Sequence, residues 1–264
     1  MDRGLGPEFG AAGFDANVAT LLIVRTVDLE SMAKQAQLEA HPRPTLLSDF
    51  ILGSQDGIVN VLGILLGLVA AGTEIKYIIV AGLAALAAES LSMAAVAYTS
   101  TQSRRKLYAA EVERELSEMR EVPELEREEV RVILRDWGFT EAEVADLLQR
   151  IESKPKAWLD LMMAFELRLA PVAESAPRNS AIIVGFATLL GHAVPLLPFF
   201  FLGKNTTEAA FIAILLSAIM LFLIGYYEAR TTIGSLWASG ARLLLIGLAS
   251  GFAGFLIGYG LTHL

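Results

Sequence analysis

Glutamates recur at helical spacing in the charged middle of the chain. Glu111, Glu115 and Glu118 follow one another at intervals of four and three residues, so a helix would place all three on one face. Glu126 and Glu129, three residues apart, would share a face of a second helix. Like charges stacked in this way repel by a few tenths of a kcal/mol per pair, so such faces are stable when water solvates them or when a cation binds between them.

Two adjacent methionines, Met162 and Met163, lie within one helical turn of Glu166. Thioether sulfur combined with carboxylate oxygen suits a transition metal better than Ca²⁺ or Mg²⁺, which prefer oxygen alone. The residues indicated as metal ligands by type and spacing are Glu115, Glu118, Glu126, Glu129, Met162, Met163 and Glu166.

Each of these groups also has a purely structural explanation. Methionine often fills irregular gaps in a core, so Met162 and Met163 fit packing as well as metal binding. The acidic faces can be solvated surfaces that are neutralised by nearby Arg114, Arg127 and Arg131. The sequence leaves both alternatives open.

A second set of acids lies inside stretches that are otherwise apolar. Asp56 is about ten residues into the first stretch, roughly 15 Å deep at 1.5 Å per residue. A lone carboxylate near the centre of a bilayer costs about 2.5–3.5 kcal/mol, so it should face a cavity or a partner. Glu89 and Met93, four residues apart, share a face of the second stretch. No lysine or arginine lies deep inside these stretches to pair with the acids, since Lys76 is at the mouth of the second one. Asp56, Glu89 and Met93 therefore indicate a membrane path for a cation, with neutral, hydrogen-bonded acids as the alternative. His192, beside two prolines, is interpreted as a packed residue outside the site.

Helices that cross a membrane must carry these acids. About 20 apolar residues are needed to cross roughly 30 Å of hydrocarbon, and five stretches qualify: 46–71, 75–99, 181–202, 208–227 and 241–263. The links at 72–74 and 203–207 are short, so the first and second spans, and the third and fourth, form helical hairpins. Pairs of glycines spaced four apart on the first and fifth spans favour tight helix packing, with a dimer contact as one option.

Charge is segregated along the 264 residues. Residues 101–178 hold 17 of the 29 acidic and 13 of the 21 basic residues, whereas 45–100 and 180–264 together hold six acidic and four basic ones. The chain is therefore predicted to be all-α, with an N-terminal segment (1–44), two spans (45–100), a charged insert (101–178) and three further spans (179–264). A net charge of −8 without a free basic stripe argues against nucleic-acid binding, and the absence of cysteine excludes thiolate metal sites.

Helix signals divide the insert into four pieces. The first continues the second span to about residue 121, where Pro123 stops it and begins a helix that ends near residue 137. Thr140 and Glu143 form a capping-box pattern that opens a third helix, to about residue 152. A fourth helix is predicted over 156–169, closed by Pro171. No stretch alternates like a strand, so the insert is a small helical domain.

Basic residues place the N-terminus and the insert in the cytosol, because cytoplasmic loops carry the excess of lysine and arginine. One side of the layout holds Arg43, Arg104, Arg105, Lys106, Arg178, Arg230 and Arg242, and the other holds Lys76 and Lys204. Five spans put the C-terminus on the opposite side. Residues 15–40 of the N-terminal segment are predicted to form an amphipathic helix on the membrane surface or against the insert.

Four stretches together resemble the vacuolar iron transporter family, which comprises the vacuolar iron and manganese importers and their prokaryotic relatives. They are SDFILGSQDGIVNVLGILLGL in the first span, AAESLSMAAVAYTS in the second, WLDLMMAFEL in the insert and PRNSAIIVGFATLLGHAVPLLPFF in the third. The resemblance covers about residues 45–264. One departure is Val96-Ala97, where close relatives often have Gly-Glu.

The resemblance implies a homodimer with its translocation path along the dimer axis. It implies that Asp56 and Met93 bind the metal in transit, and that the insert glutamates, with Met162 and Met163 beside them, form a cytosolic metal-binding domain. The implied function is transport of Fe²⁺, with Mn²⁺, Co²⁺ and Zn²⁺ as further candidates, out of the cytosol by H⁺ antiport. The implied membrane is vacuolar in a eukaryote and cytoplasmic in a prokaryote. No enzymatic activity and no prosthetic group are expected.

The alternative is a membrane-anchored metal sensor or iron store that does not transport. A ferroxidase of this kind would need Glu-x-x-His pairs, and the insert contains no histidine. An anchor also has no use for Asp56 and Glu89 inside the membrane, so the transporter is the favoured interpretation.

Overall fold

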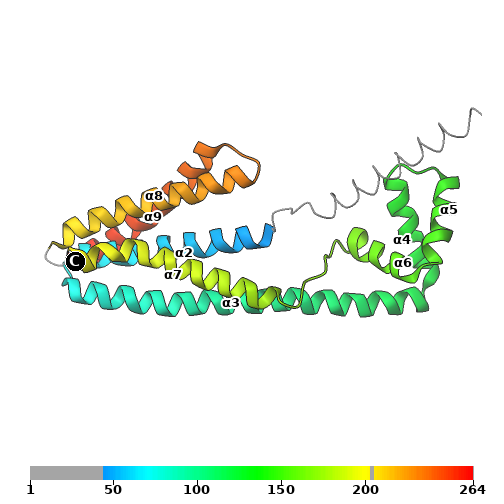
Figure 1. Ribbon diagram of the computed structural model, residues 1–264, viewed down its shortest axis with the longest axis horizontal. Helices are drawn as coiled ribbons and strands as arrows, with labels where there is room; N and C mark the ends of the chain where they lie inside the picture. The colour runs from blue at the N-terminus through cyan, green and yellow to red at the C-terminus, as the bar shows by residue number, and fades with distance from the viewer. Residues whose placement is uncertain (1–43, 203–204, 264) are drawn as a thin grey trace, which may run out of the picture. The chain divides into compact units, whose positions relative to one another are not determined.

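The computed structural model describes residues 44–202 and 205–263, and every regular element in these ranges is helical. The elements are α2 (Pro44–Ala70), α3 (Ile75–Glu121), α4 (Pro123–Asp136), α5 (Glu141–Glu152), α6 (Pro155–Leu161), the π-helix η1 (Met162–Glu166), α7 (Ala176–Phe201), α8 (Thr206–Thr231) and α9 (Leu236–Thr262) (Figure 1). The all-α prediction is confirmed for this part of the chain. The amphipathic helix expected over 15–40 lies outside the described residues.

Five helices, α2, α3, α7, α8 and α9, are long and apolar enough to cross a membrane, as predicted. A helix of 26 residues, such as α7 or α8, is about 39 Å long at 1.5 Å per residue, which exceeds the roughly 30 Å of hydrocarbon. The 47 residues of α3 extend about 70 Å, so its apolar first half can span while its charged second half continues into the insert without a break. The protein is therefore a multi-pass membrane protein.

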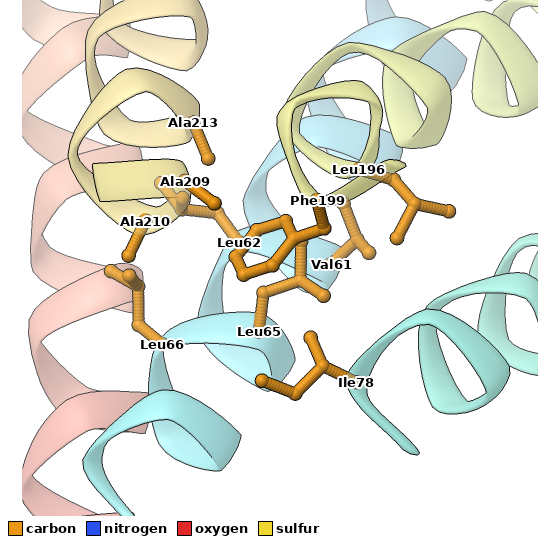
Figure 2. Packing of buried hydrophobic residues seen from close by; sticks show 10 residues of the cluster. All are labelled: Val61, Leu62, Leu65, Leu66, Ile78, Leu196, Phe199, Ala209, Ala210 and Ala213. Carbon is orange, nitrogen blue, oxygen red and sulfur yellow. The ribbon is translucent and has the colours of Figure 1, made fainter. Parts of the chain in front are cut away.

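The apolar core of the spanning helices is centred on α2, which contacts α3, α7, α8 and α9. Figure 2 shows side chains of α2 packed against side chains of α3, α7 and α8. The buried members of this core are Val61, Leu62, Leu65, Leu66, Ile78, Leu196, Phe199, Ala209, Ala210 and Ala213. Alanines on α8 let its backbone approach large residues of α2 and α7, as small residues commonly do between membrane helices.

Glycines set the closest helix crossings, and they do so within one chain. A β-carbon on Gly254 or Gly258 of α9 would lie 2.0 Å from the carbonyl oxygen of Gly63 or Gly67 of α2, respectively. Tight packing by these pairs is thus confirmed. In the described part of the chain, these four glycines face a neighbouring helix of the same chain.

Replacing Gly254 with alanine is expected to lower the thermal unfolding temperature of the detergent-solubilised protein. The new β-carbon would meet backbone, which cannot turn away as a side chain can, and such overpacking costs about 1–3 kcal/mol. Gly260→Ala in the same helix is the matched control, since no atom lies within 4 Å of its β-carbon position. Equal unfolding temperatures for the two variants would contradict this account of the crossing.

The helices of the insert begin where local signals predicted. Pro123 stands in the first turn of α4, and Gly138, with a φ of +89°, follows its end. Thr140 caps α5 through a capping box, in which its backbone N–H donates to Glu143 Oε2 at 2.8 Å. A buried apolar core joins α4, α5, α6 and η1, and consists of Val130, Leu134, Val144, Leu148, Trp158 and Met162.

The fourth helix of the insert differs from the prediction. It begins at Pro155, as α6, but changes into the π-helix η1 at Met162 and ends at Glu166 rather than near residue 169. The Leu167 N–H donates to the Met162 carbonyl five residues earlier, at 3.1 Å. Arg168 then adopts a left-handed φ of 54°, which terminates the helix before Pro171 can. A single π turn of this kind is frequent at functional sites.

Candidate metal centres

Three glutamates of the insert converge from three different elements. Glu115 of α3, Glu126 of α4 and Glu166 of η1 each offer one carboxylate oxygen, and these oxygens all lie within 4.8 Å of one another. Glu115 is 1% exposed and Glu126 is 2% exposed, whereas Glu166 is exposed. We refer to these three residues as the insert cluster. Its arrangement would let one cation contact three oxygen ligands.

Two oxygens of the insert cluster are buried without a hydrogen-bond donor. Oε1 of Glu115 and Oε2 of Glu126 have no partner in the described part of the chain. Burying an ionised carboxylate without a partner is strongly unfavourable, and neighbouring like charges add to the cost. A bound cation or bound protons would remove this cost, so the cluster has the chemistry of a cation site.

The three arginines named as possible neutralising groups pair with other glutamates. Their ion-pair partners are Glu111 for Arg114, Glu124 and Glu152 for Arg127, and Glu128 for Arg131. These partners lie outside the insert cluster. Neutralisation by arginine therefore accounts for the outer glutamates of the insert, but it does not account for Glu115 and Glu126.

The remaining insert residues predicted as ligands flank the cluster. Glu118 and Glu129 are partly buried, and burial together with the charge of Glu126 raises the pKa of the Glu129 carboxyl. Met162 and Met163 are buried, at 0% and 2% exposed. Met162 belongs to the apolar core of the insert, so packing accounts for its burial.

Metal binding by the insert cluster is expected to weaken as the pH falls below about 7. Desolvation of its carboxyl group by the surrounding helices, followed by the negative charges of Glu129 and Glu126, raises the pKa of Glu166 from 4.5 to about 7. Metal ligands must be deprotonated, so binding should be lost as the pH falls through 7 rather than through 4.5. Proton competition at Glu166 alone predicts about tenfold weaker affinity at pH 6 than at pH 8. The difference should be larger still, because burial and the neighbouring Glu126 raise the pKa of Glu115 to about 8.

Titrations of Mn²⁺ at these two pH values, in an Asp56→Asn/Glu89→Gln/His192→Gln background that removes the acids and the imidazole of the spanning helices, measure this difference. The control is Glu124→Gln, which removes an exposed glutamate outside the cluster. It should show the same pH dependence as its parent. Equal affinity at both pH values would contradict the prediction.

A second polar cluster lies among the spanning helices. Asn60 of α2 donates to Asp56 Oδ1 at 3.1 Å and also to Glu89 Oε1 of α3. Glu89 Oε2 lies 3.0 Å from His192 Nε2 of α7. We refer to Asp56, Asn60, Glu89 and His192 as the membrane cluster. No ion pair with lysine or arginine is formed by these residues in the described ranges.

Close contact between α2 and α7 positions the membrane cluster. A β-carbon on Gly57 would lie 2.4 Å from the Thr188 carbonyl oxygen, and one on Gly191 would lie 2.5 Å from that of Ser54. Only glycine fits at such crossings, so the two helices approach closely enough for the His192 ring to lie against Gly57, the residue that follows Asp56. Met93 lies one turn after Glu89 on α3, partly exposed, and is not among the hydrogen-bonded members.

His192 is the member that sequence reasoning missed. It was interpreted as a packed residue, and it is indeed 0% exposed, but its ring contacts Glu89 of a different helix. The signal was available, because any ionisable residue within an apolar span is a candidate functional residue. The identity of its partner could not be predicted from the sequence, since Glu89 is 103 positions away in the chain.

Comparisons with known proteins match most of the chain to one family of proteins. The model of the VIT family matches residues 47–259. The chain is 31% identical over 210 residues to Vacuolar iron transporter 1 of Eucalyptus grandis, covering 80% of this chain and 84% of that protein. It is 29% identical over 235 residues to Vacuolar iron transporter 1 of Arabidopsis thaliana, with 87% and 94% covered. It is 27% identical over 223 residues to Protein CCC1 of Saccharomyces cerevisiae, with 81% and 69% covered.

Proposed function

The chain belongs to the VIT family, and from this membership we propose that it transports Fe²⁺ out of the cytosol, into a vacuole or across the cell membrane, in exchange for protons. Relatives named as vacuolar iron transporters support iron as the cargo. Mn²⁺, Co²⁺ and Zn²⁺ are further candidate cargoes, because carboxylate ligands accept several divalent ions. The observation that carries the proposal is a pair of acidic clusters, one in the insert and one within the spans, neither of them paired with a lysine or arginine of the described ranges.

We assign to the insert, residues 101–178, the role of capturing the metal ion on the cytosolic side. The insert cluster holds two buried carboxylates, each with one oxygen that lacks a donor within the described residues, and a divalent cation would satisfy both at once. Glu118 and Glu129 add negative charge around it, and Met163 is a buried residue of η1, the helix that carries Glu166. A metal held there is concentrated near the cytosolic end of the second span, because α3 runs from one to the other.

Passage across the bilayer is the role we assign to Asp56, Glu89 and Met93. Asn60 is exposed, and Asp56 and Glu89 are partly exposed, in the single chain. Polar groups facing lipid are costly, so this face needs a cover. A second copy of the chain would supply one and would place the same acids on both sides of a shared path, which supports a homodimer.

Proton exchange follows from the same acids. The Asn60 amide holds the carboxyl groups of Asp56 and Glu89 close to each other, so a bound cation, either a proton or a metal ion, relieves their mutual repulsion. Binding of a divalent cation would displace that proton, and release of the cation would allow its return. Metal movement in one direction is thereby linked to proton movement in the other.

Uptake of Fe²⁺ into proteoliposomes under anaerobic conditions tests the proposal. Vesicles with an acidic interior should take up Fe²⁺ in a protein-dependent manner, and uptake should stop when an ionophore collapses the pH gradient. Metal bound by the protein without any gradient-driven uptake would instead favour the membrane-anchored sensor or store.

A further inference from the structure

The imidazole of His192 has a defined orientation. Its Nδ1 lies 3.1 Å from the backbone carbonyl oxygen of Thr188, one turn earlier in α7. A carbonyl oxygen only accepts, so Nδ1 carries the hydrogen and, in a neutral ring, Nε2 carries the free lone pair. The ring is held against α2 at Gly57, where a β-carbon would lie 2.9 Å from Nδ1.

The lone pair of Nε2 faces a second acceptor. Glu89 Oε2 lies 3.0 Å away, while Glu89 Oε1 receives the amide of Asn60. Two acceptors at this distance require a cation between or beside them, which is either a proton or a metal ion. Two ligand atoms that bind one metal at right angles, each at about 2.1 Å, are themselves about 3.0 Å apart. Metal-binding histidines also commonly donate their second ring N–H to a carbonyl oxygen, as His192 does.

From this geometry we infer that His192 Nε2 binds the transported ion together with Glu89 Oε2, with Asp56 next to them across the Asn60 amide. The inference rests on the proposed function, because the ion is its cargo. Imidazole nitrogen suits Fe²⁺, Co²⁺ and Zn²⁺, whereas Mg²⁺ and Ca²⁺ prefer oxygen alone. His192 is thereby the residue that lets the membrane cluster reject hard cations.

The insert cluster and the membrane cluster would then differ in which cations they bind. The three carboxylates of the insert cluster offer oxygen atoms, which hard and borderline cations both accept. The membrane cluster adds a nitrogen ligand on a rigid ring that is 0% exposed. Mg²⁺ should therefore compete with Fe²⁺ at the insert but not within the spans.

Metal competition in the proteoliposome assay tests this selectivity. Glutamine at position 192 can still donate a hydrogen bond to Glu89 but is a poor ligand for Fe²⁺. The parent for this test is the variant Glu115→Gln/Glu126→Gln/Glu166→Gln, which removes Mg²⁺ competition at the insert. In this background, His192→Gln is expected to raise the half-saturating Fe²⁺ concentration by on the order of 10-fold, and to make Fe²⁺ uptake sensitive to excess Mg²⁺. The control is His263→Gln, at the end of α9, which should match the parent. An unchanged Fe²⁺ response together with unchanged insensitivity to Mg²⁺ would overturn the inference.

Pulsed electron paramagnetic resonance of bound Mn²⁺ tests the ligand directly and needs no substitution in α7. The protein carries Glu115→Gln, Glu126→Gln and Glu166→Gln, so that Mn²⁺ binds in the membrane cluster. Its histidines are labelled with ¹⁵N, and His41 and His263 are replaced by glutamine. A change from ¹⁴N to ¹⁵N modulation on labelling is the expected result, and bound Mn²⁺ without histidine modulation would refute the inference. This measurement is independent of flux, so absence of gradient-driven Fe²⁺ uptake in the parent would count against the proposed function alone.

Discussion

Replacing Asp56 with asparagine is expected to reduce gradient-driven Fe²⁺ uptake by about 100-fold. Asparagine preserves the size of the side chain and the contact with Asn60 but removes the negative charge that offsets a divalent cation within the bilayer. An uncompensated charge at that depth costs about 2.5–3.5 kcal/mol, and a barrier raised by this amount slows passage by roughly two orders of magnitude. Metal binding by the insert should be unchanged, because Asp56 is not part of the insert cluster.

The assay compares initial rates of Fe²⁺ uptake and, in parallel, Mn²⁺ binding to the same detergent-solubilised proteins. The matched control is Glu208→Gln, which removes a carboxylate from the first turn of α8, outside the membrane cluster. It should transport at the parental rate. Substantial uptake by the Asp56 variant would show that the path does not pass this residue, while loss of binding at the insert would show that the variant is misfolded.

Helix positions in this protein are predictable because local rules decide them. Five long apolar stretches can only be satisfied as helices in lipid, where every backbone polar group needs a partner within its own segment. Pro123 and the capping box at Thr140 act through their own neighbours, so the starts of α4 and α5 follow from a few residues. The fourth insert helix departs from prediction because the π turn at Met162 changes the hydrogen-bonding pattern and Arg168 ends it. Neither effect has a residue-level signal in the sequence.

The candidate sites are only partly predictable, because partners come from distant segments. Helical spacing puts Glu111, Glu115 and Glu118 on one face, yet only Glu115 enters the insert cluster, through α4 and η1 packing against α3. The spacing could not show that Arg127 would pair with Glu152 from another helix rather than with Glu126. Tertiary packing decides which carboxylates are left without a cationic partner, and those are the ones that carry the proposed chemistry.

Removing the three charges of the insert cluster is expected to separate capture from passage. In the variant Glu115→Gln/Glu126→Gln/Glu166→Gln, the side chains keep their size but no longer bind a divalent cation as carboxylates do. The half-saturating Fe²⁺ concentration for uptake should rise by at least about 10-fold, because the metal is no longer concentrated beside the path. The maximal rate at saturating Fe²⁺ should stay near the parental value, since the membrane cluster is intact.

The control for this experiment removes the same number of charges from the same domain. Glu124, Glu128 and Glu141 all pair with arginines on the exposed surface, and exposed ion pairs contribute little. Their triple glutamine variant should give the parental uptake curve. Identical curves for both triple variants would mean that the insert cluster does not deliver metal to the path. Loss of transport by the cluster variant even at saturating Fe²⁺ would give the cluster a different role, because the insert would then have to open the path as well as supply it. The concentration dependence of uptake therefore distinguishes a site that raises the local metal concentration from one that gates its passage.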